Sequence, residues 1–411
     1  MSNSKNFDAR VAILTAGRDK PYALGLAESL AAAGENLDFI CGDEFGDAEF
    51  RENPNVNVLN LRGDQRIEAG MMSKISRVLI YYWRLICYAA TAKPKVFHIL
   101  WNNKFEWFDR TALMLFYKLL GKKIVLTAHN VNIAKRDGYD SFLNRLTLKI
   151  QYQLCDHIFV HAEKMKDELV SEFEVSENKT DVIPLGINNS VPNTSLSGLD
   201  ARQKLGLSPQ EKVILFFGQI APYKGLEFLV AAFARIAKEN STCRLLIVGR
   251  PKGPKDYWNR VQELISESGV SDRILQKIEF VPDAETEIFF KAADVLILPY
   301  VHIFQSGVLF LGYSFGLPVI AADVGSLKKE IVEGKTGFIF EAQNAAALAR
   351  TIQNYFESDL HYELESRRHE IQNFANERYS WSKVAAITTA VYSKLLRAEK
   401  KHEPQFAAEQ S

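Results

Sequence analysis

The chain has 411 residues, of which 47% are hydrophobic and 24% charged, and its formal net charge at pH 7 is zero. This composition is typical of a globular protein and excludes a disordered or fibrous chain. The length predicts two domains, and the balanced charge excludes the overall basicity typical of a nucleic-acid-binding protein.

A reducing compartment is indicated by four scattered cysteines without metal-ligand spacing: Cys41, Cys87, Cys155 and Cys243. We expect them to be small buried hydrophobic residues. The N-terminal sequence MSNSKNFDAR has no apolar signal segment, and no window approaches the roughly 18 to 20 apolar residues of a spanning helix. The expected location is the cytoplasm, with peripheral contact to the inner face of the cell membrane left open.

Short β-rich runs alternate with amphipathic helical stretches along the first half, which predicts a parallel sheet with helices on both faces. A first helix is expected between Pro21 and Gly34, because proline favours helix starts and glycine favours helix ends. The predicted strands lack strict polar alternation, as expected where both faces of a sheet are buried. They are Val11–Thr15, Leu37–Cys41, Val56–Leu61, Val96–Leu100, Ile124–Ala128, His157–His161 and Asp181–Pro184.

The pattern breaks at residues 188–200, NNSVPNTSLSGLD, whose composition is typical of an interdomain linker. The predicted fold class is α/β, with two doubly wound, Rossmann-like parallel-sheet domains of residues 1–188 and 189–380. Ligands of such sheets bind beyond the carboxyl ends of the strands, so a cleft between the domains is the expected site. The strands predicted in the second half are Val213–Phe217, Arg244–Val248, Ile278–Phe280, Val295–Pro299, Val319–Ala321 and Gly337–Phe340.

A diphosphate site is predicted in residues 215–225, LFFGQIAPYKG. A strand ends at Gly218, where the missing Cβ lets another group approach the backbone. Lys224 precedes a helix expected from about Leu226, and both its ammonium group and the helix N-terminus favour anionic oxygens. The alternative is a solvated lysine in a turn.

A second anion site is predicted in residues 293–327, ADVLILPYVHIFQSGVLFLGYSFGLPVIAADVGSL. Ser306 is expected to cap a helix whose first turn contains Gly307 and Val308. The unpaired amides of that turn would face the same cleft as Lys224. The alternative is a well-capped βαβ unit without a ligand, but two anion sites in one half favour a diphosphate more than either does alone.

The C-terminal half contains several motifs in a fixed order along the chain. FFGQIAPYKGLEFLVAAFARI is followed by LLIVG, IEFVPD, AADVLILPY, GLPVIAADVGSLKKEIVEGKTGFIF and YSWSKVAAITTAVY. Together they resemble the family 4 retaining glycosyltransferases and their GT-B relatives, over about residues 205–400. The first half is similar more loosely, through VIPLGIN and LTAHN. The resemblance implies a GT-B fold in which a closing helix, residues 381–400, packs back on the first domain; residues 401–411 are expected to be a mobile tail.

The resemblance also implies roles for residues at matching positions. Gly17 and Gly218 would leave room for the donor, and the backbone near Val281 would meet its nucleobase. Lys224 and the amides after Gln305 would bind the diphosphate. The implied donor-binding positions are Gly17, Gly218, Gln219, Lys224, Val281, Gln305, Ser306, Gly307 and Val308.

His129, at the end of a predicted strand in LTAHN, is implied as the catalytic residue that faces the transferred sugar from the first domain. As a nearly neutral group it would hydrogen-bond the sugar or stabilise charge at the anomeric carbon. The alternative is a packed histidine at a strand end.

The sequence departs from the family pattern at three places. Gln219 stands where the family has an arginine, which removes one cation from the donor site. The usual Glu-x7-Glu pair falls on the apolar Ile303 and Leu311, so that Gln305 is expected to take over a polar contact. Ala16 occupies the first position of the glycine pair that usually follows the first strand.

A basic and aromatic stretch lies in the first domain. Residues 62–136 contain fourteen Lys or Arg against four acidic residues, an excess of ten. They include a predicted helix, KISRVLIYYWRLICYAA, whose cations lie near Tyr81, Tyr82 and Trp83. Such a composition suits an anionic membrane interface, at roughly 1 kcal/mol per cation. We expect residues 74–110 to dock on a membrane; the alternative is a core-facing helix with an ordinary solvated stripe.

The predicted activity is transfer of a sugar from an NDP-sugar donor to the hydroxyl of a saccharide or polyprenyl-diphosphate-linked acceptor. We expect retention of configuration, no metal or other cofactor, and a place in cell-surface polysaccharide or glycolipid synthesis. One alternative is another GT-B enzyme, either a sugar-nucleotide epimerase or an inverting transferase. The other is a non-catalytic sugar-nucleotide-binding partner of a polysaccharide assembly complex, which the apolar Ile303 and Leu311 would suit.

Overall fold

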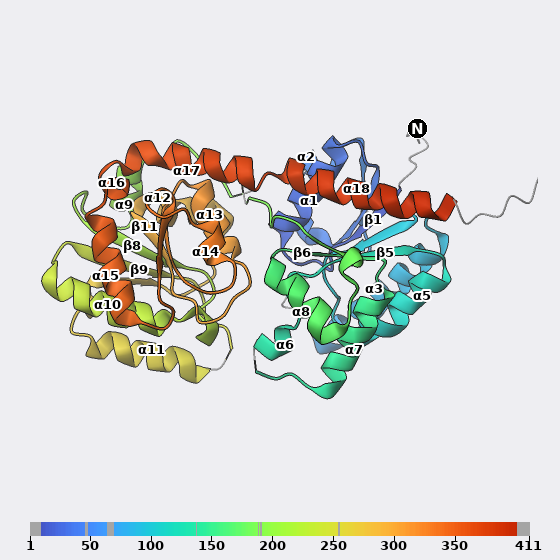
Figure 1. Cartoon of the computed structure of the whole chain (residues 1–411), viewed down its shortest axis with the longest axis horizontal. Helices are drawn as coiled ribbons and strands as arrows, with labels where there is room; N and C mark the ends of the chain where they lie inside the picture. Colours follow the sequence, from blue (N-terminus) through green and yellow to red (C-terminus); the bar gives the residue numbers. More distant parts are fainter. Residues whose placement is uncertain are drawn as a thin grey trace, which may run out of the picture. The chain divides into compact units, whose positions relative to one another are not determined.

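The computed structural model describes residues 10–45, 48–63, 70–136, 138–187, 189, 191–253 and 255–400. The predicted tail, residues 401–411, lies outside the described residues. The chain divides into two compact units (Figure 1). The N-terminal unit ends at Gly186 and is joined by the chain from Trp381 onward, and the C-terminal unit is Ile187–Ser380.

The N-terminal unit contains a parallel sheet of seven strands in the order β3-β2-β1-β4-β5-β6-β7. Its central strands are buried on both faces, which explains their nearly continuous apolar sequence. The strands are β1(Val11–Leu14), β2(Leu37–Cys41), β3(Val56–Asn60), β4(Val96–Ile99), β5(Lys123–Thr127), β6(His157–Val160) and β7(Thr180–Val182).

The C-terminal unit contains a parallel sheet of six strands in the order β10-β9-β8-β11-β12-β13. The strand order reverses beside β8, and ligands of such sheets bind outside the carboxyl ends at this switch point. The strands are β8(Lys212–Phe217), β9(Cys243–Val248), β10(Ile274–Lys277), β11(Val295–Leu298), β12(Val319–Ala322) and β13(Gly337–Phe340).

One predicted strand is wrong. Residues Ile278–Phe280 were expected to pair, but the edge strand β10 is Ile274–Lys277, which pairs with β9 from Leu245 onward. The Gly249 amide donates to the Lys277 carbonyl where this pairing ends, and Phe280 beyond it is exposed. An edge strand has only one neighbour, so its place depends on that partner's register, which the apolar pattern of the segment does not contain.

Helix α18 belongs to the N-terminal unit although it closes the chain. It lies along α1 (Figure 1). Its first residue, Trp381, fills the space that glycines leave, because a Cβ at Gly25 or at Gly186 would collide with the indole ring. The helices of this unit are α1(Lys20–Ala32), α2(Ala48–Arg51), α3(Met71–Thr91), α4(Glu106–Phe108), α5(Met114–Leu119), α6(Ile133–Arg136), α7(Phe142–Leu154), α8(Glu163–Phe173) and α18(Trp381–Lys400).

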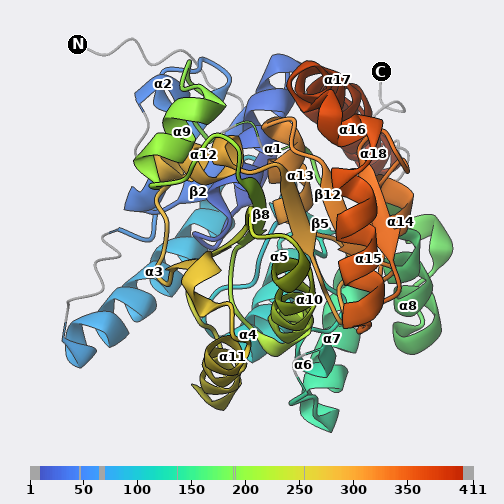
Figure 2. The same cartoon turned by 90° about the vertical axis from the view of Figure 1, so that its left-hand side faces the viewer.

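Helices cover both faces of the C-terminal sheet, with α10 and α11 on one side and α12 and α13 on the other (Figure 1). Figure 2 shows α15 beside α10. The helices of this unit are α9(Gly198–Lys204), α10(Leu226–Glu239), α11(Lys255–Glu267), α12(Asp283–Ala292), α13(Gly307–Ser314), α14(Leu327–Glu330), α15(Ala345–Phe356), α16(Asp359–Tyr362) and α17(Leu364–Arg378).

Two further expectations about burial need correction. Cys87 is exposed on α3, whereas the other three cysteines are buried as expected. Tyr81 and Tyr82, predicted to lie with the cations at a membrane surface, face the interior instead. The Tyr82 hydroxyl donates to the Asp109 carboxylate at 2.9 Å, an interaction that needs a tertiary neighbour.

Candidate active site

Lys224 lies in the C-terminal unit between the carboxyl end of β8 and the start of α10. It ends the 3₁₀ turn η4(Pro222–Lys224), and the chain then enters α10 through Gly225 in the left-handed conformation (φ 64°). The side chain is buried, and Nζ donates to the Tyr300 hydroxyl at 2.6 Å. Nζ also lies 3.9 Å from the centre of the Tyr300 ring. The alternative of a solvated lysine in a turn is therefore wrong.

Ser306 occupies the N-cap position of α13, but its side chain does not cap the helix as predicted. Its hydroxyl lies 3.2 Å from the Tyr300 hydroxyl instead. Gly307 begins α13, is exposed, and has nothing within 4 Å of the place where a Cβ would be. The start of the helix thus has room for an anion at its amides.

Tyr300 connects the two predicted anion sites. Its hydroxyl contacts both the Lys224 ammonium and the Ser306 hydroxyl, which places the cation within two hydrogen bonds of the helix start. The convergence of the two loops is therefore observed. Sequence reasoning missed Tyr300 as a site residue, although its position directly after Leu298 and Pro299 at a strand end was a usable signal.

The glycine at the end of β8 also lies at this place. Gly218 has φ 116°, a conformation that favours glycine, and a Cβ on it would lie 3.5 Å from a Val308 methyl carbon. Gln219 follows it and is half-buried. The structure thus brings Gly218, Lys224, Ser306, Gly307 and Val308 together at one edge of the sheet.

Two predicted donor residues lie apart from these contacts. The Gln305 side-chain oxygen is buried without a hydrogen-bond partner among the described residues, so its capacity to accept a hydrogen bond is unsatisfied there. Val281 is buried after β10, beside the exposed Phe280. The Arg250 guanidinium lies 5.7 Å from the centre of the Phe280 ring.

His129 lies in the N-terminal unit directly beyond β5, among aromatic side chains. Its ring stacks on Trp101 at a centroid distance of 4.2 Å and meets the edge of Tyr22 at 4.6 Å. Its Nδ1 lies 3.1 Å from His161 Nε2. Burial and the neighbouring histidines hold the pKa of His129 well below its usual range, so the ring is neutral at pH 7.

The hydrogen-bond network assigns the protons of this histidine pair. His161 Nδ1 lies 3.2 Å from the Ile183 carbonyl, which only accepts, so His161 carries its proton on Nδ1. Burial lowers the pKa of His161 to about 4, so its Nε2 is an acceptor and His129 Nδ1 must donate to it. His129 Nε2 then carries a lone pair, and it is buried without a partner among the described residues.

His161 and Trp101 were not predicted as site residues. His161 directly follows the end of β6, and Trp101 lies two residues beyond the end of β4. Carboxyl ends of neighbouring parallel strands meet at one sheet edge. The position of both residues relative to the strands was therefore the signal that could have found them.

Gly17 lies in a left-handed turn beyond β1. The turn has positive φ values at Ala16 (50°), Gly17 (65°) and Asp19 (43°), and the Gly17 amide donates to the Thr15 hydroxyl. Ala16 thus adopts the conformation for which the family pattern has glycine. Asp19 caps α1 by accepting from the Tyr22 amide at 3.3 Å.

A hollow of about 710 Å³ in the C-terminal unit lies away from these residues, beside α9, α16 and the start of α17. It is at the amino end of β11, where Arg202 pairs with Asp294 at 2.7 Å. Arg368 donates there to the carbonyl of Ala293. Since its cations already bind backbone oxygens and a carboxylate, we assign this hollow a structural role.

Both halves of the chain match known families. Residues 21–191 match the family model described as Glycosyltransferase Family 4, and residues 211–358 match the model described as Glycosyl transferases group 1. The D-inositol 3-phosphate glycosyltransferase of Corynebacterium efficiens is 25% identical over 286 residues, which covers 67% of this chain and 66% of that relative.

Two solved structures are similar over most of the chain. Sucrose-phosphate synthase of Thermosynechococcus elongatus has a TM-score of 0.74 at 20% identity, covering 95% of this chain and 100% of that one. HepE of Anabaena, solved with UDP and glucose, has a TM-score of 0.72 at 17% identity, and the match covers 94% of this chain and 100% of HepE. The two parallel-sheet units and these neighbours define the GT-B fold. Within that class, the chain belongs to the family 4 glycosyltransferases.

Proposed function

We propose that the chain transfers a glycosyl group from an NDP-sugar to an acceptor hydroxyl. The observation that carries the proposal is the position of the Lys224 ammonium, joined through Tyr300 to the start of α13. A cation and unpaired helix amides together suit a diphosphate. The proposal is further supported by HepE, which was solved with UDP and glucose.

In this reaction the bond between the anomeric carbon and the diphosphate oxygen breaks, and a bond to the acceptor oxygen forms. Lys224 and the amides at Gly307 stabilise the negative charge on the leaving diphosphate, which is commonly the largest catalytic contribution. We infer attack on the same face as the leaving group, with the acceptor proton passing to the diphosphate. The configuration is then retained without a separate general base.

His129 has a different role in the proposal. Its unprotonated Nε2 accepts a hydrogen bond from a hydroxyl of the transferred sugar. The neutral ring stacked on Trp101 is a rigid acceptor for this purpose. The sugar is oriented by this bond before the diphosphate leaves.

Metal independence is also part of the proposal, because a cation and amides supply the positive charge that a divalent ion would otherwise bring. Turnover with an NDP-sugar and a suitable acceptor in the presence of excess EDTA tests it. Complete loss of turnover in EDTA, restored by a divalent ion, would contradict metal independence.

The acceptor is proposed to be a saccharide or a polyprenyl-diphosphate-linked molecule, in cell-surface polysaccharide or glycolipid synthesis. Residues 74–110, through α3, would dock the enzyme on the inner face of the cell membrane, where such acceptors lie. Helix α3 supports this idea, because its residues Ile75, Leu79 and Trp83 are exposed.

The first experiment is a thermal-shift screen against UDP-, GDP-, ADP- and dTDP-sugars. A ligand at 100 times its Kd stabilises the folded state by about 2.7 kcal/mol, which gives a measurable rise in Tm. Analysis of the products with and without acceptor then separates the alternatives: an epimerised NDP-sugar formed without acceptor indicates an epimerase. Binding without any turnover over a broad acceptor panel indicates a non-catalytic partner.

The substitution Lys224→Met tests the diphosphate site. It keeps an unbranched apolar side chain beside Tyr300 but removes the ammonium, so donor affinity should fall at least tenfold, since a charged hydrogen bond contributes about 1.5–3 kcal/mol. Lys238→Met, at the exposed end of α10, is the matched control and should leave donor affinity unchanged. Equal affinities for Lys224→Met and the unsubstituted protein would refute the assignment.

A further inference from the structure

Helix α7 exposes an apolar face that its sequence alone did not single out. Leu148 and Tyr152 point inward and are buried, whereas Phe142 is 82% exposed. Leu143, Leu146 and Ile150 are also exposed, at the spacing of one helix face. A helix that buries one apolar stripe and exposes a second indicates a binding surface for a partner, because an ordinary solvent-exposed helix face is polar.

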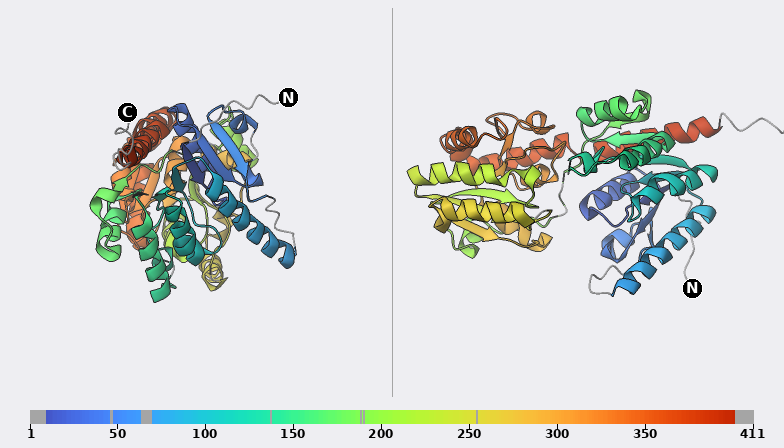
Figure 3. Two further views of the ribbon diagram at one scale, coloured as in Figure 1. Left: turned by 90° about the vertical axis from the view of Figure 1, so that its right-hand side faces the viewer. Right: turned by 90° about the horizontal axis from the view of Figure 1, so that it is seen from below.

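Helix α3 exposes a similar face. Ile75, Leu79 and Trp83 are about half-exposed or more, and all residues from Gly70 to Ser76 are exposed. In Figure 2 and in the left-hand view of Figure 3, α3 and α7 both reach the lower side of the N-terminal unit. Large apolar residues exposed along one face of a helix indicate a protein or membrane contact.

Direct contacts join α3 to α7 through the segment 105–110. The Tyr82 ring of α3 stacks on Phe105 at 5.6 Å and meets the edge of Phe108 at 5.4 Å. Arg110 then donates to the Asn144 side-chain oxygen of α7 at 2.9 Å. Phe105 and Trp107 of this segment are themselves more than half exposed. The three apolar faces therefore belong to one connected part of the unit.

The charges of the two helices indicate the partner. Helix α3 contains Lys74, Arg77 and Arg84 and no acidic residue. Helix α7 also lacks acidic residues, but its cations Arg145 and Lys149 pair with Asp140 and Glu174, so the positive charge of this surface comes from α3. Basic residues that flank an apolar helix face are typical of helices lying on an anionic bilayer. A second copy of the chain would bring the same positive charge to the contact, which disfavours self-association.

We propose that α3, residues 105–108 and α7 form one docking surface for an anionic lipid bilayer, and that α7 fixes this surface to the loop that carries His129. Among the described helices, none combines the length and apolar character needed to cross a bilayer. The contact proposed here is thus one of side chains inserted into the interfacial layer.

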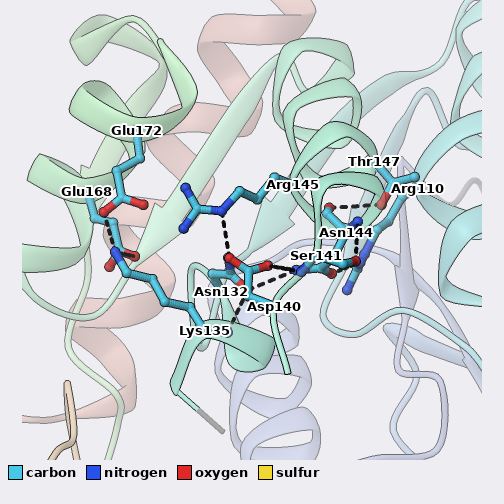
Figure 4. Close-up of polar contacts among 10 residues, drawn as sticks. All are labelled: Arg110, Asn132, Lys135, Asp140, Ser141, Asn144, Arg145, Thr147, Glu168 and Glu172. Atoms are coloured by element: carbon cyan, nitrogen blue, oxygen red, sulfur yellow. Dashed lines mark hydrogen bonds and ion pairs between the residues drawn. The ribbon is translucent and has the colours of Figure 1, made fainter. Parts of the chain in front are cut away.

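A polar network holds the start of α7 to the His129 loop (Figure 4). Asp140 accepts from the side chains of Asn132 at 3.1 Å, Asn144 at 2.7 Å and Arg145 at 2.6 Å. The Asn132 oxygen accepts in turn from the Asn144 amide group at 3.0 Å. Burial alone would raise the pKa of Asp140, but these hydrogen bonds outweigh it and lower the pKa to about 2. The network therefore stays charged across the physiological range.

This network has a consequence for the acceptor. Asn132 lies three residues after His129 and is buried, so the bilayer surface bound by α7 has a set position relative to the sugar-facing ring. This inference rests on the proposed function. Of the two acceptor classes proposed there, it selects the lipid-anchored one, whose hydroxyl group is presented from the membrane. A freely soluble saccharide needs no such surface.

The test is flotation of the full chain with vesicles of phosphatidylcholine, with and without phosphatidylglycerol. Binding is expected only with the anionic lipid at low salt. The double variant Phe142→Ser/Leu146→Ser should reduce the bound fraction at least tenfold, and so should Leu79→Ser/Trp83→Ser, because both remove apolar side chains that insert.

The matched control is Leu199→Ser/Tyr362→Ser, which removes exposed apolar residues of the C-terminal unit and should float like the unsubstituted protein. Unchanged flotation of the α7 variant would overturn the proposal, as would absence of binding to anionic vesicles. A dimer in solution that the α7 variant disrupts would also overturn it in favour of self-association. The thermal shift caused by the NDP-sugar donor separates the docking proposal from the proposed function. A variant that no longer floats but keeps the donor shift has lost only membrane docking. Absence of a donor shift in the unsubstituted chain would refute the proposed function.

Discussion

The proton on His129 depends on a neighbouring histidine, His161. His161 is fixed by the Ile183 carbonyl, and it presents an acceptor to His129 Nδ1. This leaves Nε2 of His129 as the free acceptor. A single residue at the end of β6 thus determines what a residue at the end of β5 can bind, and His161 is a positioning residue in this sense.

Substitution of His161 tests that dependence. In His161→Leu the partner of His129 Nδ1 is lost, so the His129 proton is shared between its two nitrogens and part of the population cannot accept from the sugar. We expect kcat to fall about ten- to a hundredfold, with little change in the thermal shift caused by the donor diphosphate. His369→Leu, at an exposed histidine of α17, is the control. A kcat equal to that of the unsubstituted enzyme would contradict the role of His161.

Backbone conformation gives a second prediction at the scale of one residue. Ala16 is buried at φ 50°, where a Cβ is disfavoured by about 1–2 kcal/mol. Ala16→Gly should therefore raise the free energy of unfolding by about 0.5–1 kcal/mol in urea denaturation. Ala33→Gly, at an ordinary φ of −77°, should lower it. A less stable Ala16→Gly variant would show that the alanine methyl contributes more by packing than it costs in strain.

At the scale of elements, the closing helix α18 is part of the N-terminal core. His98 on β4 lies within hydrogen-bonding distance of the Tyr392 hydroxyl at 2.6 Å and of the Thr127 hydroxyl at 2.8 Å. All three residues are buried, so the bond joins the last helix to the centre of the first sheet.

Removal of that bond should weaken the N-terminal unit. Tyr392→Phe leaves His98 Nδ1 buried without its partner, which costs about 1–3 kcal/mol. Urea unfolding followed by far-UV circular dichroism measures the loss, and Tyr362→Phe, whose side chain is exposed, is the comparison. Equal stability of the two variants would mean that water replaces the tyrosine hydroxyl.

Prediction of the elements from sequence succeeded best in the interior of the sheets. Strand β2 was predicted at the observed residues and β8 to within one, because a buried parallel strand between turn residues is a local signal. It failed at the edge strand β10 and at the cap of α13, where Ser306 bonds to Tyr300 instead of the helix. In both cases a tertiary neighbour decides between local options.

At the scale of the whole molecule, buried histidines connect stability to pH. Burial lowers the pKa of His98 to about 3 and that of His161 to about 4, and it lowers the pKa of His129 as well. Unfolded histidines titrate near pH 6.5, so below that pH the unfolded chain binds more protons than the folded one. The free energy of unfolding is therefore not reduced by these histidines above pH 6.5, and it decreases as the pH falls below that value.

We therefore expect the chain to be markedly less stable at pH 5 than at pH 7, by on the order of 2 kcal/mol for each of His98 and His161, with a further loss from His129. Asp109 acts in the opposite sense, because burial raises its pKa to about 6 and the folded state then holds an extra proton. Urea denaturation at both pH values measures the difference, and His161→Leu should make it smaller. Equal stabilities at pH 5 and pH 7 would show that the histidines are solvated.

The sequence by itself determined the two consecutive α/β domains, most of their strands, and the two segments around Lys224 and Gly307 that are predicted to bind an anion. These features follow from periodicity, spacing and turn residues within short stretches of chain, so they can be read without knowing the neighbours. Only the tertiary structure decided that Tyr300 joins those segments, that His161 sets the proton on His129, and that α7 exposes its apolar face. Each of these contacts depends on the strand order and on side chains from separate elements, and no local pattern contains that information.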